Sequence, residues 1–287
     1  MSLLVVGTTA LDSIKTPYAE NPRLLGGSAS HAAVAASFFT PTHLVGAVGE
    51  DFPRKYINLY RRHGLCLEGL DQLPGQTFHW SGEYEVNMNN RRTLDTVLGV
   101  IENYSPTLPA AYTRLPYLLL ANIAPDLQGH VLSQMKRPKF VVADTMDLWL
   151  NIARPAVLKL LKRIDCLVLN DSEAAQLVEE DNIVAALPRI HKLGPKYVIV
   201  KKGEHGAILS GPKGLFVAPA YPLKKVVDPT GAGDSFVGGL MGYLASQKGS
   251  LDKNLRAAII HGTVTASYCC EDFGLKKTTK VKKTDIS

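Results

Sequence analysis

The 287-residue sequence contains only four cysteines and no long apolar run, and each shortage excludes a class of protein. No two cysteines show Cys-x-x-Cys spacing, and the adjacent Cys269 and Cys270 are poorly placed for a disulfide, so a reducing, cytoplasmic location is expected. The richest apolar stretch, residues 115–124, falls far short of the roughly 18–20 residues that span a bilayer, and the N-terminus lacks the basic region of a signal peptide. We therefore expect no membrane partner.

Little net positive charge lies outside one segment. The formal net charge is +6, but residues 276–287 alone contain five lysines and one aspartate, which leaves the rest of the chain nearly neutral. A nucleic-acid-binding protein usually carries its basic residues as a patch across the fold. We expect no nucleic-acid partner, and we predict that the Lys-rich tail, residues 276–287, is solvated; an interaction surface is the alternative.

Several common site motifs are also absent. The sequence contains no G-x-x-x-x-G-K-[ST] phosphate loop, no G-x-G-x-x-G fingerprint, no H-E-x-x-H and no G-x-S-x-G. The eight histidines include no pair at metal-ligand spacing with a cysteine, so a structural zinc site is not expected either. Any catalytic chemistry must use another arrangement of residues.

What the sequence does contain is a regular alternation of short apolar runs and longer segments with helical periodicity. This alternation is typical of a mostly parallel sheet with helices on both faces, an α/β fold in three layers, α/β/α, which we expect as a single domain over residues 1–287. The predicted strands are 3–6, 44–48, 117–121, 140–143, 166–169 and 197–200, followed by a hairpin at 207–218. The predicted helices are 29–39, 52–63, 126–136, 154–163, 172–180, 183–193, 232–247 and 252–270.

Residues 65–101 break this alternation because polar and apolar side chains alternate singly between turn signals. The pattern predicts an antiparallel insertion, a small β lid over a site at the strand ends; an edge hairpin without ligand contact is the alternative. Its aromatic residues suit stacking on a base, covering a sugar face or packing within the flap: Phe78, Trp80 and Tyr84. An exposed edge strand also suits pairing with a second copy, so a homodimer through the lid is expected.

Residues 226–240, VVDPTGAGDSFVGGL, form the most informative segment. An extended run is followed by a Pro-Thr-Gly-Ala-Gly turn and an amphipathic helix, so the turn lies at a helix N-terminus. The first N–H groups of a helix lack internal acceptors, and those of Gly231, Ala232 and Gly233 can converge on an anion. Asp234 has two interpretations: a carboxylate that stabilises the helix N-terminus, or a base for an alcohol that attacks a phosphoryl group in this anion hole.

The runs DPTGAGDSF at 228–236 and GGSASHAA at 26–33, with the spacing between them, resemble the PfkB family of carbohydrate kinases over nearly the whole chain. The resemblance implies a ribokinase-like fold and the transfer of phosphate from ATP, with Mg²⁺, to an alcohol. It implies that Asp234 is the catalytic base and that Gly231–Gly233 form the anion hole for the γ-phosphate. Asp228 and Thr230 are expected near a loop that in some relatives binds a monovalent cation such as K⁺.

Further positions match the family residue by residue. On the acceptor side, the resemblance implies that Asp12 binds substrate hydroxyls and that Gly26 and Gly27 form a hinge near the substrate. Glu173 is expected to hold Mg²⁺ through water; the alternative is a capping box with Asn170. The resemblance assigns these residues to the nucleotide side: Asn170, Glu173, Lys202, Gly203, Gly206 and His261.

Two departures from the family pattern lie on the acceptor side. His31 stands where many members have Asn, and residues 144–146 read Asp-Thr-Met in place of Asp-Pro-Asn. His31 is either a substrate-binding residue or a packing residue of the first helix. The leading hypothesis is an ATP-dependent kinase that phosphorylates a hydroxymethyl group of a small sugar. The alternatives are a nucleoside kinase of the adenosine, inosine or cytidine type and a non-catalytic ligand-binding protein on the same fold.

Overall fold

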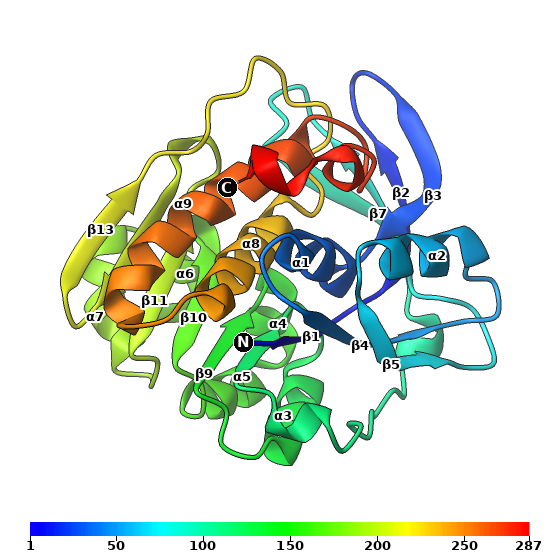
Figure 1. Cartoon of the computed structure of the whole chain (residues 1–287). Coiled ribbons are helices and arrows are strands. Elements are labelled where there is room, and N and C mark those ends of the chain that lie inside the picture. The colour runs from blue at the N-terminus through cyan, green and yellow to red at the C-terminus, as the bar shows by residue number, and fades with distance from the viewer. Residues whose placement is uncertain (287) are drawn as a thin grey trace.

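A nine-stranded sheet lies at the centre of the computed structural model, which describes residues 1–286 (Figure 1). In spatial order its strands are β13 (Gly214–Ala218), β12 (Ala207–Gly211), β11 (Tyr197–Lys201), β10 (Cys166–Asn170), β9 (Phe140–Asp144), β8 (Tyr117–Leu120), β1 (Leu3–Val6), β4 (Thr42–Val48) and β5 (Cys66–Gln72). Neighbours from β11 to β5 pair in parallel, and β12 and β13 form an antiparallel hairpin at one edge. The sheet is therefore mostly parallel, as the alternation predicts.

Helices cover both faces of this sheet because its strands carry apolar side chains on both sides. In β1, Leu3 and Val5 pack on one face, and Leu4 and Val6 pack on the other. The first face is covered by α1 (Ser28–Ser37), α2 (Arg54–Arg62), α8 (Ala232–Ser246) and α9 (Leu251–Cys270). The second is covered by α3 (Pro125–Gln134), α4 (Asp147–Ile152), α5 (Arg154–Leu161), α6 (Asp171–Val178) and α7 (Ile183–His191). The predicted α/β/α layering is confirmed.

A separate four-stranded sheet forms the lid. Its order is β3 (Glu20–Gly26), β2 (Ala10–Lys15), β6 (His79–Tyr84) and β7 (Arg91–Val97), with β2 and β6 parallel and the outer pairs antiparallel. The predicted insertion, residues 65–101, is wrong at its start because β5 belongs to the large sheet, where it pairs with β4. A hairpin from residues 10–26 supplies the other half of the lid, and its sequence signal is weak because β3 is largely polar and exposed.

The described part of the Lys-rich tail folds against α9. It contains two short 3₁₀ turns, Thr278–Lys280 and Lys283–Asp285, and it buries the side chains of Thr278 and Ile286. The Ile286 carbonyl accepts a hydrogen bond from Nδ1 of His261 at 3.1 Å. The prediction of a solvated tail holds for four of its five lysines, which are exposed, and is wrong for Thr278 and Ile286, which pack inward. Along residues 1–286 no helix has both the length and the apolar character needed to cross a membrane.

Candidate active site

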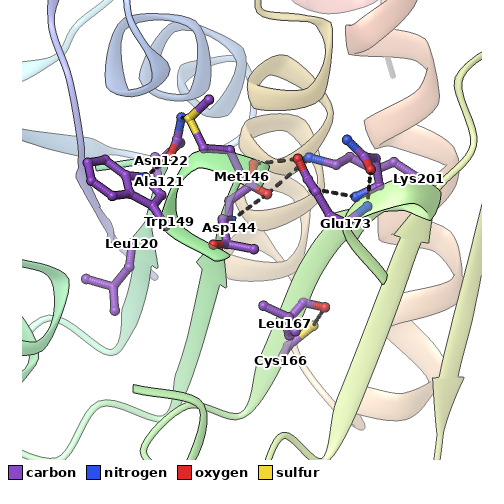
Figure 2. Close-up of polar contacts among 12 residues, drawn as sticks. Leu120, Ala121, Asn122, Asp144, Met146, Trp149, Cys166, Leu167, Glu173 and Lys201 are labelled. Atoms are coloured by element: carbon purple, nitrogen blue, oxygen red, sulfur yellow. Dashed lines mark hydrogen bonds and ion pairs between the residues drawn. The ribbon is translucent and has the colours of Figure 1, made fainter. Parts of the chain in front are cut away.

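The carboxyl ends of three parallel strands bring charged side chains together. Asp144 ends β9, Asn170 ends β10 and Lys201 ends β11. In a parallel sheet these ends meet at one edge, where ligands bind in open α/β folds. Figure 2 shows Asp144 and Lys201 side by side at this edge, with Glu173 of α6 next to them. The N-terminus of α8 lies beside the same cluster, because a Cβ on Gly233 would be 3.1 Å from Nζ of Lys201.

The turn before α8 is shaped by Asp228. One carboxylate oxygen of Asp228 accepts the N–H of Thr230 and the other accepts the N–H of Gly274, each at 2.9 Å. Gly231 is the N-cap of α8 with φ at 78°, a left-handed conformation that favours glycine. The N–H of Ala232 donates to the carbonyl of Pro229 at 3.1 Å. The predicted anion hole therefore rests on Gly231 and Gly233, since the Ala232 N–H already has an acceptor.

Asp234 follows this turn in the first turn of α8 and is half-buried. Burial and the charge of Asp144 raise its pKa to about 6, against the opposing effect of Lys201 and Arg91. A carboxyl group with a pKa near 6 is mostly ionised at neutral pH and is a stronger base than an ordinary aspartate. The position and the pKa of Asp234 are those that a general base for an alcohol needs.

Lys201 forms a buried ion pair with Asp144. Its Nζ lies 3.1 Å and 3.2 Å from the two carboxylate oxygens, and both side chains are largely shielded from solvent. Although burial lowers the pKa of Lys201, the carboxylates of Asp144 and Glu173 raise it above its usual value. The lysine is therefore charged, and the sequence reasoning missed both partners. The sequence feature that could have identified Asp144 and Lys201 is their position directly after the predicted strands.

Glu173 caps the helix that follows β10. Its backbone N–H donates to Oδ1 of Asn170, and its Oε2 accepts the N–H of Asn170, both at 2.7 Å. The capping box predicted as the alternative is thus confirmed. Burial raises the pKa of Glu173, the ammonium of Lys201 opposes this increase, and Asp144 adds to it. The resulting pKa is about 7. Glu173 therefore belongs to the charged cluster as well as to the helix cap.

Asp12 lies on β2 of the lid, above the first residues of α1. Its Oδ2 accepts the N–H of Gly27 at 3.3 Å, and its Oδ1 is buried without a partner among the described residues. A Cβ on Gly26 would lie 1.8 Å from Oδ2, so only glycine leaves room for this carboxylate. Gly27 has φ at 91°, where glycine is again favoured. The structure thus brings Asp12, Gly26 and Gly27 together around an unsatisfied acceptor.

The carboxylates of Asp12 and Asp234 are near enough for their charges to interact. Burial and the carboxylates of Asp228 and Asp234 raise the pKa of Asp12 to about 7, although the N–H of Gly27 holds it down. Two acidic groups thus converge from the lid and from α8. A ligand that donates hydroxyl hydrogens would satisfy both.

Asn122 contacts the segment after β9, where the sequence departs from the family pattern. Its Oδ1 accepts the indole N–H of Trp149 at 2.8 Å, and its Nδ2 contacts Sδ of Met146 at 3.0 Å. Its carbonyl accepts the hydroxyl of Ser28 at 2.7 Å, which joins the end of β8 to the start of α1. Figure 2 shows this group beside the Asp144 end of β9. Met146 and Trp149, two large and mostly apolar side chains, thus hold the side chain of Asn122.

A cavity of about 640 Å³ lies on the other side of the α8 N-terminus. Ala232 and Gly233 line it, together with Gly203, Gly206 and Lys201. Its other walls come from the loop 220–226, from the lid and from one face of α9; the lid residues are Tyr18 and 87–89, and the α9 residues are Thr263, Ala266, Ser267 and Cys270. Sequence reasoning missed these walls because a loop and a helix face carry no local motif.

Four residues predicted for the nucleotide side lie outside this lining: Asn170 and Glu173, which form the helix cap, and Lys202 and His261. Lys202 donates its N–H to the carbonyl of Gly206 at 2.8 Å and is displaced by one residue from the lysine that does line the cavity, Lys201. His261 stacks on Tyr243 with ring centroids 4.0 Å apart and meets Phe39 edge-on. The ring of His261 therefore packs between helices and does not line this cavity, and its contact with the nucleotide stays a prediction.

His31 lies beneath the anion-hole turn. Its side chain is 1% exposed, and burial lowers its pKa to about 4. A Cβ on Gly231 would lie 2.4 Å from the imidazole ring, and Sγ of Cys269 lies 3.6 Å from its Nδ1. These contacts match the packing interpretation, in which the ring supports the turn from inside the protein. A contact between His31 and the substrate stays a prediction.

A family model described as pfkB family carbohydrate kinase matches residues 19–281 of the chain. A cytidine kinase from Thermococcus kodakarensis is 28% identical over 252 residues, which cover 85% of this chain and 88% of the relative. A 2-dehydro-3-deoxygluconokinase from Haemophilus influenzae is 35% identical over 275 residues, which cover 84% of this chain and 86% of the relative.

Solved structures share the fold over almost the whole chain. A nucleoside kinase from Methanocaldococcus jannaschii, described as an archaeal member of the ribokinase family, superposes with a TM-score of 0.78 at 20% identity and covers 99% of this chain and 96% of its own. A fructokinase from Vibrio cholerae, with fructose, ADP and calcium bound, superposes with a TM-score of 0.81 at 17% identity and covers 99% of this chain and 97% of its own. The predicted ribokinase-like fold is confirmed.

Proposed function

The chain belongs to the pfkB family of carbohydrate kinases and is a phosphotransferase, and from this premise we propose that it transfers the γ-phosphate of ATP to the hydroxymethyl group of a small sugar. The observation that carries the proposal is the position of Asp234, which is half-buried, directly follows Gly231–Gly233 in the first turn of α8, and is near enough to the buried carboxylate of Asp12 for their charges to interact. An acceptor hydroxyl bound by Asp12 would lie close to the base. The cavity lined by Gly233 suits the nucleotide.

The proposed reaction is a single in-line displacement. Asp234 takes the proton of the acceptor hydroxyl, and the acceptor oxygen forms a bond to the γ-phosphorus. The bond between the γ-phosphorus and the bridging oxygen breaks, and ADP leaves with that electron pair. The N–H groups of Gly231 and Gly233 and the dipole of α8 stabilise the negative charge of the transferred group.

The cluster at the strand ends suits a divalent cation carried by the nucleotide. Three carboxylates, Asp144, Glu173 and Asp234, interact there with the single ammonium of Lys201, which leaves an excess of negative charge in a shielded place. Glu173 is the residue that we propose holds Mg²⁺ through water, and the ion would supply neutralisation of the phosphate charge. Within residues 1–286 no set of three or more His, Cys, Asp or Glu side chains is arranged to bind a metal directly.

A monovalent-cation site near Asp228 and Thr230 stays a prediction, and the hydrogen bonds of both residues within the chain have a structural role. Both carboxylate oxygens of Asp228 accept backbone N–H groups, and the carbonyl of Thr230 accepts the thiol of Cys269 at 3.2 Å. These residues therefore shape the turn before α8, and no step of the proposed reaction uses K⁺ there.

A nucleoside acceptor is the second candidate, because a cytidine kinase is similar to this chain over most of both sequences. The lid offers a flat surface for a base. The indole of Trp80 packs against the inner apolar cluster of the lid, its Nε1 donates to Thr93 at 3.2 Å, and the Arg91 guanidinium lies 5.8 Å from its ring centre. A stacked base and an apolar sugar face would both use this ring.

The test is ATP consumption across a matched panel of sugars and their nucleosides. A sugar kinase should turn over free pentoses or hexoses, and a nucleoside kinase should require the base. Asp234→Asn should lower kcat by about 10²–10⁴-fold and leave nucleotide binding intact. A panel without turnover, combined with tight binding of a sugar or nucleoside, would favour the non-catalytic alternative. We also propose that a homodimer forms through the lid, which sedimentation would test.

A further inference from the structure

Lys201 lies beside the predicted anion hole. Its Nζ lies so close to the α8 N-terminus that a Cβ on Gly233 would be 3.1 Å from it. Lys201 also lines the 640 Å³ cavity, on the same wall as Gly233. The ammonium is therefore placed beside the amide that would hold the transferred phosphoryl group.

The ion pair with Asp144 leaves part of the ammonium unused. A lysine ammonium has three N–H donors, and the two oxygens of Asp144 accept at 3.1 Å and 3.2 Å. One donor remains for a further acceptor. Buried ion pairs contribute little net stability, because the loss of hydration offsets the attraction, so stability alone does not account for a charged pair here.

We propose that Lys201 is a side-chain donor to the transferred phosphoryl group and that Asp144 is the positioning residue that aims it. The proposal rests on the proposed function, in which Gly231 and Gly233 form the anion hole. An ammonium there adds a full positive charge to two neutral N–H groups, and charge-assisted hydrogen bonds are about twice as strong as neutral ones. Asp144 holds the flexible lysine stem in one place, so that less freedom is lost on binding.

The sharpest test compares two nucleotides that differ by the γ-phosphate. Calorimetry would measure the dissociation constants of ADP and AMP-PNP, both with Mg²⁺, for the wild type and for Lys201→Met. If Lys201 contacts the γ-phosphoryl group, Lys201→Met should weaken AMP-PNP by roughly 10- to 100-fold and leave ADP nearly unchanged. Lys201→Arg, which keeps the charge, should recover part of the preference for AMP-PNP.

Turnover gives a second measurement. Lys201→Met should lower kcat by about 10²–10³-fold, the effect of removing one donor from an oxyanion-type site. Asp144→Asn should lower kcat by a smaller factor, because the lysine remains but is no longer held. Lys196→Met is the matched control: this exposed lysine precedes the same strand, lies 5.3 Å from the Tyr197 ring centre, and should leave both nucleotide affinities and kcat unchanged.

An equal loss of ADP and AMP-PNP affinity in Lys201→Met, or no loss of either, would overturn the proposal. If the Met variant does not fold by circular dichroism, Lys201→Gln, which is polar and of similar length, is measured by the same comparison. The nucleotide comparison needs no acceptor, so it is independent of the panel. If the panel shows no turnover and AMP-PNP is still preferred through Lys201, the proposed function fails while the contact stands.

Discussion

Asp12→Asn should stabilise the fold at neutral pH while it weakens acceptor binding. Asp12 is 4% exposed, and burial raises the pKa of its carboxyl from 3.8 to about 7. A carboxyl group whose pKa is higher in the folded protein favours folding below its unfolded pKa, and this contribution is lost as the pH rises through the folded pKa. A shift of about three units corresponds to roughly 4 kcal/mol. Because relaxation of the site reduces this figure, we expect the free energy of unfolding to rise by about 2–4 kcal/mol at pH 8.

Urea unfolding of wild type and variant at pH 4, 6 and 8 measures this effect. The difference should be small at pH 4, where the folded wild type is protonated at Asp12, and should grow until about pH 7. Asp51 is the matched control: although burial raises its pKa, hydrogen bonds from Thr77 and Arg23 hold it below 3.8, so Asp51→Asn should destabilise. If Asp12→Asn is no more stable than wild type at pH 8, the buried charge of Asp12 does not destabilise the folded protein.

Two further predictions concern the acceptor side and the base. The pKa of Asp234, raised to about 6 by burial and by Asp144, should make kcat fall about tenfold per pH unit below about pH 6; a kcat that stays flat down to pH 5 in a buffer series would contradict its role as base. Gly26→Ala would place a Cβ 1.8 Å from Oδ2 of Asp12, so KM for the acceptor should rise at least tenfold with KM for ATP unchanged. Gly129→Ala, where φ is likewise not positive and the new Cβ would meet only Nη1 of Arg163 at 3.8 Å, controls for the loss of a glycine alone.

The sheet and its helices were predictable because each buried strand is a continuous apolar run bounded by polar residues. The ends of the predicted strands and helices lie within two residues of those in the structure. The lid was less predictable because its sheet joins segments far apart in the chain. β2 pairs with β6 across more than sixty positions, and no local pattern indicates that Ser13 lies beside Ser81. The strand β5 has the same alternation as a lid strand but pairs with β4.

The tail and His261 show a second limit of sequence reasoning. Composition predicts a solvated segment where lysines dominate, yet Ile286 packs inward and its carbonyl binds Nδ1 of His261. The same contact, with the stack on Tyr243, turns His261 away from the cavity. A helix presents one face to a ligand and another to its neighbours. Which face of α9 does which depends on α8 and on the tail, and neither is encoded within α9 itself.

The adjacent lysines 201 and 202 differ by one position in the chain, yet only Lys201 lines the cavity. Lys201 ends β11 and pairs with Asp144, whereas Lys202 lies one residue beyond the strand and outside the lining of the cavity. A motif match tolerates a shift of one residue, whereas the pairing of β11 with β10 does not, because it sets Lys201 opposite Asn170 at the strand end. Asp144 then selects the same lysine by its charge. The register of this strand pair therefore places Lys201 at the strand end, where it pairs with Asp144. We expect Lys201→Met to lose affinity for AMP-PNP and Lys202→Met to keep it, and calorimetry on the two variants would measure this difference.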